Sequence, residues 1–325
     1  ERTGILSLFG GLALFLFGMD RMSEALQQAA GERLRRALAA LTRTPLTGAL
    51  AGMVVTAVMQ SSSATTVMVI GFVSAGLLEL PQAVAVIFGA NIGTTVTAQL
   101  LAFRVEEMLG LVLFGGFFLC AVARTKRGRQ MGTAVFSFGL LFAGMEQIQS
   151  VVEPLALRPE FEAWMAQVRE KPLWGLLLGL GMTLVVQSSS ATIGVLQGVA
   201  RQAGPDGVHS LLGLAGAVPV LLGDNVGTTI TAILAAAGGT RDAKRAAAAH
   251  CCFNLSGSLV CLLALPWFVR LVELLPPEGE ELEIIARQIA NAHTLFNALC
   301  TLIWLPLTPL MVRLVTTLVP EKRTE

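Results

Sequence analysis

Long apolar segments separated by short polar ones run along the whole chain. Most apolar segments contain about 15–25 residues, the length that a helix needs to cross a bilayer. This pattern predicts an integral membrane protein made of helices, because a membrane β-barrel would show short strands of alternating polarity. The composition agrees: 54% of the 325 residues are hydrophobic, 14% are charged and the mean hydropathy is +0.69. Soluble domains carry about 25% charged residues.

Two kinds of apolar segment are expected. The spanning helices are predicted at residues 4–28, 81–102, 107–123, 130–148, 208–238, 243–271 and 285–316. The sequence Gln-Ser-Ser-Ser breaks two shorter pairs, 45–59 with 64–77 and 172–186 with 191–201. A helix over 45–59 would be about 22 Å long at 1.5 Å per residue, short of a hydrocarbon core of about 30 Å. Each pair is therefore predicted to be a re-entrant hairpin.

The second half of the chain repeats the first. "GMVVTAVMQSSSATT" at 52–66 resembles "GLGMTLVVQSSSATI" at 179–193, and "GANIGTTVTAQLLA" at 89–102 resembles "GDNVGTTITAILAA" at 223–236. Each repeat is interpreted as helix, hairpin, broken helix and helix. The number of full crossings is odd, so the second repeat must lie upside down relative to the first. Paired broken segments in an inverted repeat are typical of a secondary transporter.

The predicted fold is therefore an all-α integral membrane protein with an inverted-topology repeat. The helices at 81–102 and 208–238 are expected to be unwound at 89–93 and 223–227. The predicted divisions are a first repeat at 1–129, a second repeat at 130–271, and a final part at 272–325 that holds an extracellular acidic loop, the last transmembrane helix and a short cytoplasmic tail.

Loop charge predicts the orientation. Basic segments at 31–44, 124–129 and 239–245 are placed in the cytoplasm, since positive residues favour that side, and the acidic or mixed segments at 149–171 and 272–283 are placed outside. This arrangement predicts a multi-pass protein of the cell inner (plasma) membrane. Its N-terminus would lie outside and its C-terminus in the cytoplasm.

The repeated serines are candidates for binding an anion. Ser61, Ser62 and Ser63, like their copies at 188–190, follow the break and begin the second half of each hairpin. Free N–H groups and the positive dipole end at a helix N-terminus favour negative charge, and the hydroxyls add donors. Two hairpins entering from opposite faces would bring two such N-termini together. That geometry suits a tetrahedral oxyanion.

The two Asn-x-Gly-Thr-Thr segments are candidates for binding a cation. An unwound helix exposes carbonyl oxygens, and hard cations such as Na⁺ bind carbonyl, amide and hydroxyl oxygens. Asp224 is the single carboxylate inside a predicted membrane break, and its counterpart in the first repeat is Ala90. An ionisable residue inside a membrane is costly and is functional by default. We expect Asp224 to bind the cation or to take part in proton coupling.

Structural roles for the same residues remain open. Serine and threonine in membrane helices often bond to carbonyls of their own helix or pack helices together. Asn254 and Asn297 lie in repeated His-x-x-Phe-Asn segments and are expected to join helices by hydrogen bonds. The sequence has no nucleophile with a paired base, no metal-spaced Cys/His set and no nucleotide-type phosphate loop, so an enzyme is not expected.

Paired Gln-Ser-Ser-Ser motifs in inverted repeats, each followed by Gly-x-Asn-x-Gly-Thr-Thr, resemble the type II sodium-dependent phosphate cotransporters, including their bacterial members. The resemblance covers about residues 5–316. It implies Na⁺-coupled uptake of inorganic phosphate, with both hairpin tips near the membrane centre and Na⁺ as the coupling ion. No organic cofactor and no nucleic acid are expected, the partners being phosphate, Na⁺ and the bilayer. A homodimer stays open, and the cytoplasmic PhoU-like domain of many bacterial members is expected to be absent.

Transferred by position, the resemblance assigns two sets of residues. The phosphate contacts would be Gln60, Ser61, Ser62, Ser63, Gln187, Ser188, Ser189, Ser190, Asn91 and Asn225. The Na⁺ ligands would be Thr56, Thr65, Thr94, Thr95, Thr183, Thr192, Asp224, Thr228 and Thr229, with Asn254 and Asn297 in support. Two alternatives are kept: a Na⁺- or H⁺-coupled carrier of another oxyanion or a carboxylate, and a phosphate-sensing membrane protein.

Overall fold

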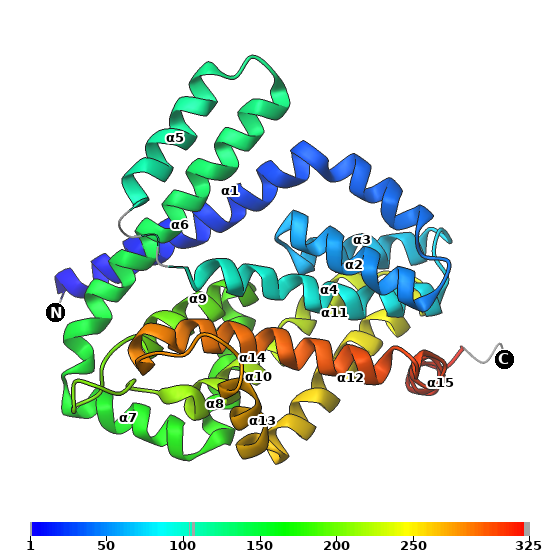
Figure 1. The fold of residues 1–325 in the computed structure, drawn as a ribbon. Helices are drawn as coiled ribbons and strands as arrows, with labels where there is room; N and C mark the ends of the chain where they lie inside the picture. Colours follow the sequence, from blue (N-terminus) through cyan, green and yellow to red (C-terminus); the bar gives the residue numbers. More distant parts are fainter. Residues whose placement is uncertain (1, 104, 106–107, 322–325) are drawn as a thin grey trace.

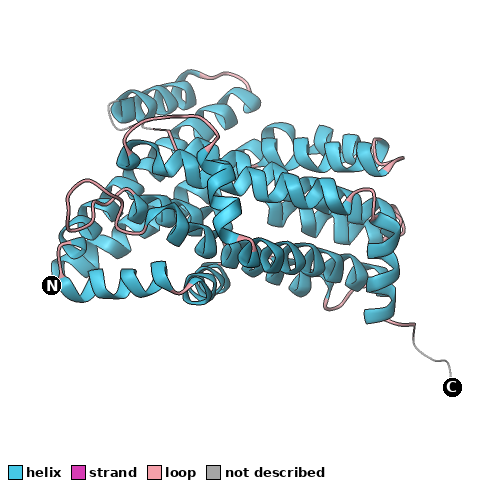
Figure 2. Cartoon of the chain, turned by 60° about the horizontal axis from the view of Figure 1, so that its bottom comes forward, coloured by secondary structure: helices cyan, strands magenta, loops and turns pink. Residues whose placement is uncertain are grey.

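The computed structural model describes residues 2–103, 105 and 108–321, and this part of the chain is built of α-helices (Figures 1 and 2). Its helices are α1 Arg2–Ala40, α2 Pro45–Met59, α3 Ser62–Ser74, α4 Leu80–Leu101, α5 Leu109–Val122, α6 Lys126–Ala156, α7 Pro159–Glu170, α8 Pro172–Val186, α9 Ser189–Ala200, α10 Gly213–Gly227, α11 Thr229–Ala236, α12 Arg241–Leu263, α13 Leu265–Glu273, α14 Glu281–Trp304 and α15 Thr308–Leu318. The predicted all-α fold is confirmed.

Each repeat is built on a close crossing of two helices. α2 packs along α4 in the first repeat, and α8 packs along α10 in the second. A glycine faces the neighbouring backbone at both crossings: a Cβ on Gly52 would overlap the carbonyl oxygen of Val86, and one on Gly179 would overlap that of Val220. These positions need glycine because a larger residue would separate the backbones.

The repeats interlock through the helices that follow the two Gln-Ser-Ser-Ser turns. α3 contacts α11 of the second repeat, and α9 contacts α4 of the first. Gln197 of α9 is fully buried and donates hydrogen bonds to the Ala98 carbonyl of α4 and the Ala286 carbonyl of α14. α14 runs beside α4 (Figure 1). The largest apolar core therefore contains residues from both repeats and from the C-terminal helices.

α1 and α6 pack along each other and form a second apolar core around Phe15 and Leu141. α5 lies on α6, and α5 with the first part of α6 projects from the other helices in Figure 1. The outer side of α5 exposes Leu111, Phe114 and Phe117. A large exposed apolar surface of this kind suits contact with lipid.

The membrane crossings differ in detail from those predicted. Among the described residues, five helices are long and apolar enough to cross a membrane, and α14 with α15 forms a sixth candidate. The spanning helix expected at 107–123 is wrong in length: α5 has 14 residues, or about 21 Å, and residue 107 lies outside the described residues. The polar connection expected at 149–171 is largely helical, since it holds the end of α6 and all of α7.

Two of the long helices expected near the C-terminus are broken. The segment at 243–271 divides at Ala264 into α12 and α13, and the segment at 285–316 divides into α14 and α15, which meet at 88°. Pro266 and Pro306 lie at these two breaks. Proline lacks the N–H that would continue the helical bonding and clashes with the preceding turn, which explains why both segments bend there.

Candidate functional site

The two Gln-Ser-Ser-Ser motifs form the same turn. Gln60 and Gln187 have left-handed backbone conformations, with φ of 53° and 56°. Each backbone N–H donates back to a threonine carbonyl, Thr56 or Thr183, and closes the preceding helix. A left-handed residue at a helix end redirects the chain, so α2 leads into α3 and α8 leads into α9 at these points. The predicted breaks are confirmed.

The first serine of each motif caps the next helix. The Ser61 hydroxyl oxygen accepts a hydrogen bond from the Ala64 N–H, and that of Ser188 accepts one from the Ala191 N–H. Such a cap satisfies one of the free N–H groups at a helix N-terminus and leaves others available. The hydroxyls of the serines that follow, Ser62, Ser63, Ser189 and Ser190, make no hydrogen bond to another described residue.

A threonine pair joins the two halves of each hairpin. The hydroxyl oxygens of Thr56 and Thr65 lie 2.9 Å apart, and those of Thr183 and Thr192 also lie 2.9 Å apart. All four side chains are buried. These hydroxyls are predicted to bind Na⁺, and in the structure they bond the two halves of each hairpin to each other.

The Asn-x-Gly-Thr-Thr segments are more regular than predicted. α4 continues without interruption through residues 89–93, so the unwound backbone expected there is absent. In the second repeat residues 223–227 are helical as well, and Thr228, between α10 and α11, keeps helical backbone angles of φ −58° and ψ −25°. Glycine in a helix interior costs about 1 kcal/mol and permits an unwound backbone without requiring one, so both segments can stay helical.

The polar side chains of these segments satisfy carbonyls of their own helices. Asn91 and Asn225 donate to the Ile87 and Leu221 carbonyls, each at 2.8 Å. The hydroxyls of Thr94, Thr95, Thr228 and Thr229 donate to the carbonyls of Ala90, Ile92, Asp224 and Val226. This bonding is the structural role that the sequence left open. The hydroxyl oxygens keep lone pairs, so the bonds do not prevent them from binding a cation.

The His-x-x-Phe-Asn segments lie against both candidate cation segments. Asn254 donates to the Asn91 side-chain oxygen at 3.4 Å and His250 Nε2 lies 3.3 Å from the same atom. Asn297 donates to the Asn225 side-chain oxygen at 3.2 Å. The expected role of Asn254 and Asn297 in joining helices is confirmed. Their own side-chain oxygens are buried and find no partner among the described residues.

Asp224 distinguishes the second repeat from the first. Its side chain is fully buried, and its Oδ1 accepts a 2.6 Å hydrogen bond from the Thr183 hydroxyl. Oδ2 has no hydrogen-bond partner among the described residues. Ala90 holds the equivalent position on α4 and offers no such oxygen. The threonine pair of the second hairpin is therefore extended by a carboxylate.

Two further polar residues near the turns are absent from the sequence-based set. Thr97 donates to the Gln60 side-chain oxygen at 3.0 Å, and Thr294 of α14 donates to the Thr95 hydroxyl at 3.0 Å. Thr97 could have been found, because the repeat continues as "GTTVTA" and "GTTITA" and so pairs it with Thr231. Nothing in the sequence indicates the contact of Thr294, because it depends on how α14 crosses α4.

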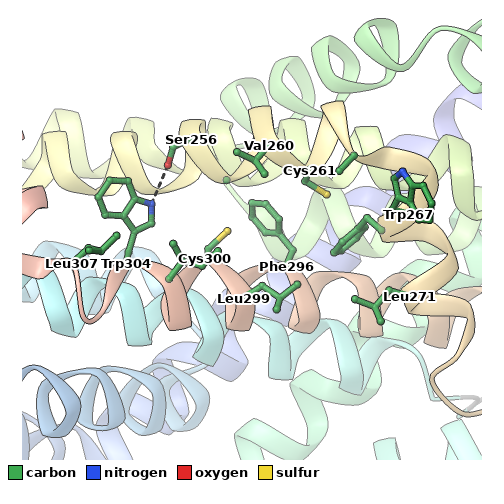
Figure 3. Close-up of a pocket in the computed structure, with 14 residues that line it drawn as sticks. Ser256, Val260, Cys261, Trp267, Leu271, Phe296, Leu299, Cys300, Trp304 and Leu307 are labelled. Atoms are coloured by element: carbon green, nitrogen blue, oxygen red, sulfur yellow. Dashed lines mark hydrogen bonds between the residues drawn. The ribbon is translucent and has the colours of Figure 1, made fainter.

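An apolar cavity lies away from the serine turns. A cavity of about 400 Å³ between α12, α13 and α14 is lined by side chains such as Val260, Trp267, Phe296 and Leu299 (Figure 3). The indole N–H of Trp304 in this cavity is bonded to the Ser256 hydroxyl. Charged ligands need polar partners when they leave water, so this cavity does not suit an anion, and the serine turns remain the candidate site.

Comparison with known proteins decides the family. A family model described as Na⁺/Pi-cotransporter matches residues 14–150 and 151–298. The chain belongs to this family. An uncharacterised Bacillus subtilis (strain 168) protein, YqeW, is 34% identical over 275 residues, which are 84% of this chain and 87% of YqeW. No solved structure matches the chain.

Two other relatives of this chain have names that state a function. Escherichia coli (strain K12) YjbB, a "putative inorganic phosphate export protein", is 28% identical over 258 residues, covering 79% of this chain and 46% of YjbB. The rat sodium-dependent phosphate transport protein 2A is 38% identical over 97 residues, covering 29% of this chain and 15% of that protein. The match thus spans less than half of either relative. The chain is a multi-pass membrane protein of a transporter family, as predicted, and not an enzyme.

Proposed function

We propose that this protein transports inorganic phosphate across the membrane together with Na⁺. The observation that carries the proposal is the pair of capped turns, each with serine hydroxyls that have no partner in the described part of the chain. Each turn presents the N-terminus of a helix, α3 or α9. Free backbone N–H groups and hydroxyl donors together suit an anion whose oxygens point in all directions.

The Na⁺ part of the proposal rests on oxygen atoms beside the same turns. Thr183, Thr192 and Asp224 form a buried group on the second hairpin and α10. Thr56 and Thr65 form the matching group on the first hairpin, without a carboxylate. A buried carboxylate is costly unless a cation or a proton compensates its charge. Na⁺ at the second group would supply that charge and would hold the Ser188 turn in place.

Coupling follows from the shared elements. Thr192 belongs to α9, whose N-terminus is capped by Ser188. A cation bound near Thr192 and an anion bound at that N-terminus would favour the same arrangement of the hairpin, and each would raise the affinity for the other. Membership of the Na⁺/Pi-cotransporter family supports both ligands. The name of YjbB indicates export for that relative, and a symporter runs in the direction that the combined gradients set.

Transport in proteoliposomes tests the proposal. Purified protein is reconstituted, and uptake of radiolabelled phosphate is compared under an inward Na⁺ gradient and an equal K⁺ gradient. We expect accumulation with Na⁺ that unlabelled phosphate suppresses and that sulfate and dicarboxylates do not. Accumulation under K⁺ alone would exclude Na⁺ coupling. Suppression by another oxyanion, or no accumulation by correctly folded protein, would favour another anion or a sensor.

A further inference from the structure

The two hairpin tips, at Gln60 and Gln187, differ in the hydrogen bonds that join them to neighbouring helices. In the first repeat the Thr97 hydroxyl donates to the Gln60 side-chain oxygen at 3.0 Å, and both side chains are buried. The carbonyl of the adjacent Met59 also accepts a hydrogen bond, from the Ser23 hydroxyl of α1. The first tip is therefore tied to α4 and to α1.

The second tip lacks the equivalent bond. Gln187 is exposed, and its side chain has no hydrogen-bond partner among the described residues. Thr231, the counterpart of Thr97, donates instead to the Thr228 carbonyl of its own chain segment at 3.0 Å. Val185, just before the tip, is 84% exposed, compared with 39% for its counterpart Val58. The motif has the same sequence in both repeats, but its glutamine is buried and bonded in the first repeat and exposed in the second.

The two threonines use their hydroxyls differently. Thr97 donates to the Gln60 side-chain oxygen, whereas Thr231 donates to the Thr228 carbonyl of its own helix. A threonine hydroxyl has one proton to donate. Thr231 therefore cannot bond to the Thr228 carbonyl and to Gln187 at the same time.

We infer that Gln60–Thr97 and Gln187–Thr231 are two copies of one latch, that the first is closed and the second open in this structure, and that they close alternately. Thr97 and Thr231 are then positioning residues that seat the tips carrying the ligand-binding serines. A single neutral hydrogen bond contributes little net stability, so a latch of this kind can open and close reversibly. The purpose of the latch rests on the proposed transport function, whereas its geometry does not.

Cross-linking tests both latches without relying on transport. The native cysteines are replaced first: Cys120, Cys251, Cys252, Cys261 and Cys300. Cysteine pairs are then introduced as Q60C with T97C and as Q187C with T231C, and a short bifunctional thiosulfonate reagent joins them. The control pairs are V58C with T97C and V185C with T231C. Each protein is treated alone, with Na⁺, and with Na⁺ plus inorganic phosphate.

We expect both latch pairs to cross-link above their controls, with yields that change in opposite directions when Na⁺ and phosphate are added. The inference is overturned if Q187C and T231C never cross-link while Q60C and T97C do, or if both yields rise together. Cross-linking of both pairs with no response to either ligand would keep two latch contacts but reject ligand-driven alternation. Proteoliposome uptake without such a response would then overturn the latch and leave the proposed transport function intact.

A second measurement needs no cysteine. Hydrogen exchange followed by mass spectrometry compares the wild-type protein with Thr97→Val, which keeps the shape of the side chain and removes the hydroxyl. We expect the amides of the first tip, around Gln60, to lose protection and those around Gln187 to gain it, because opening the first latch favours the state in which the second is closed. Thr97→Ser should restore protection. Equal exchange in the wild-type and valine proteins would show that Thr97 does not seat the tip and would overturn the inference.

Discussion

The Thr183 hydroxyl donates a 2.6 Å hydrogen bond to Oδ1 of Asp224 across the crossing of α8 and α10. Both side chains are buried, and the Thr192 hydroxyl lies 2.9 Å from that of Thr183. The carboxylate is thus linked through one threonine to the helix that begins at the second serine turn. The proposed coupling of Na⁺ to phosphate would use this connection.

Asp224→Asn should weaken the dependence of transport on Na⁺. The amide oxygen can still accept the bond from Thr183, so the change removes the charge and keeps the local packing. We expect the Na⁺ concentration for half-maximal phosphate uptake to rise by about tenfold, which corresponds to about 1.4 kcal/mol. The measurement is phosphate uptake as a function of Na⁺. An unchanged Na⁺ dependence would assign Asp224 a structural role.

Ser61→Ala and Ser62→Ala should have different effects. Loss of the Ser61 cap removes a bond to the Ala64 N–H, and we expect a loss of about 1 kcal/mol in the free energy of unfolding. Ser62 has no such bond, so its hydroxyl can serve phosphate. Losing one bond to a charged ligand costs about 1.5–3 kcal/mol, and we expect the KM for phosphate to rise by about tenfold or more.

The serine comparison is made by thermal unfolding in detergent and by phosphate uptake. Ser188→Ala and Ser189→Ala repeat it in the second turn, where Ser188 caps α9 through the Ala191 N–H. Unchanged uptake kinetics in both Ser62→Ala and Ser189→Ala would remove these hydroxyls from the binding site.

Gly179→Ala should severely destabilise the protein. The added methyl would overlap the Val220 carbonyl oxygen at the crossing of α8 and α10, and separating the two backbones should cost more than about 3 kcal/mol. Gly181→Ala is the matched control on the same helix, because its Cβ would meet nothing within 4 Å. Thermal unfolding of the two variants in detergent is the measurement. Equal stability would show that the crossing is looser than described.

Asn91→Ala should destabilise the contact between α4 and α12. Its side-chain oxygen lies within bonding distance of His250 Nε2 and of the Asn254 amide, and buried donors left without a partner cost about 1–3 kcal/mol each. Asn291→Ala is a comparison on a more exposed side chain, which donates to the Pro276 carbonyl. We expect the Asn91 variant to unfold at a clearly lower temperature. Similar unfolding temperatures would mean that Asn91 is not needed for packing.

The sequence by itself determined the helical membrane class, the repeat and the two serine turns. Apolar length and low charge leave helices as the available solution in a membrane. Two identical motifs around Gln60 and Gln187 predicted identical local geometry, because a left-handed turn followed by a serine cap depends on neighbouring residues alone. The same reasoning failed for residues 89–93, where glycine permits an unwound backbone but does not require one.

Tertiary structure decided which of the repeated groups find partners. Thr97 meets Gln60 while Thr231 does not meet Gln187, although the local sequences match. The contact of Thr294 with Thr95 depends on packing between segments far apart in the chain. A repeat fixes what each half can form locally. The surroundings of each half differ, and packing energy selects a different arrangement in each.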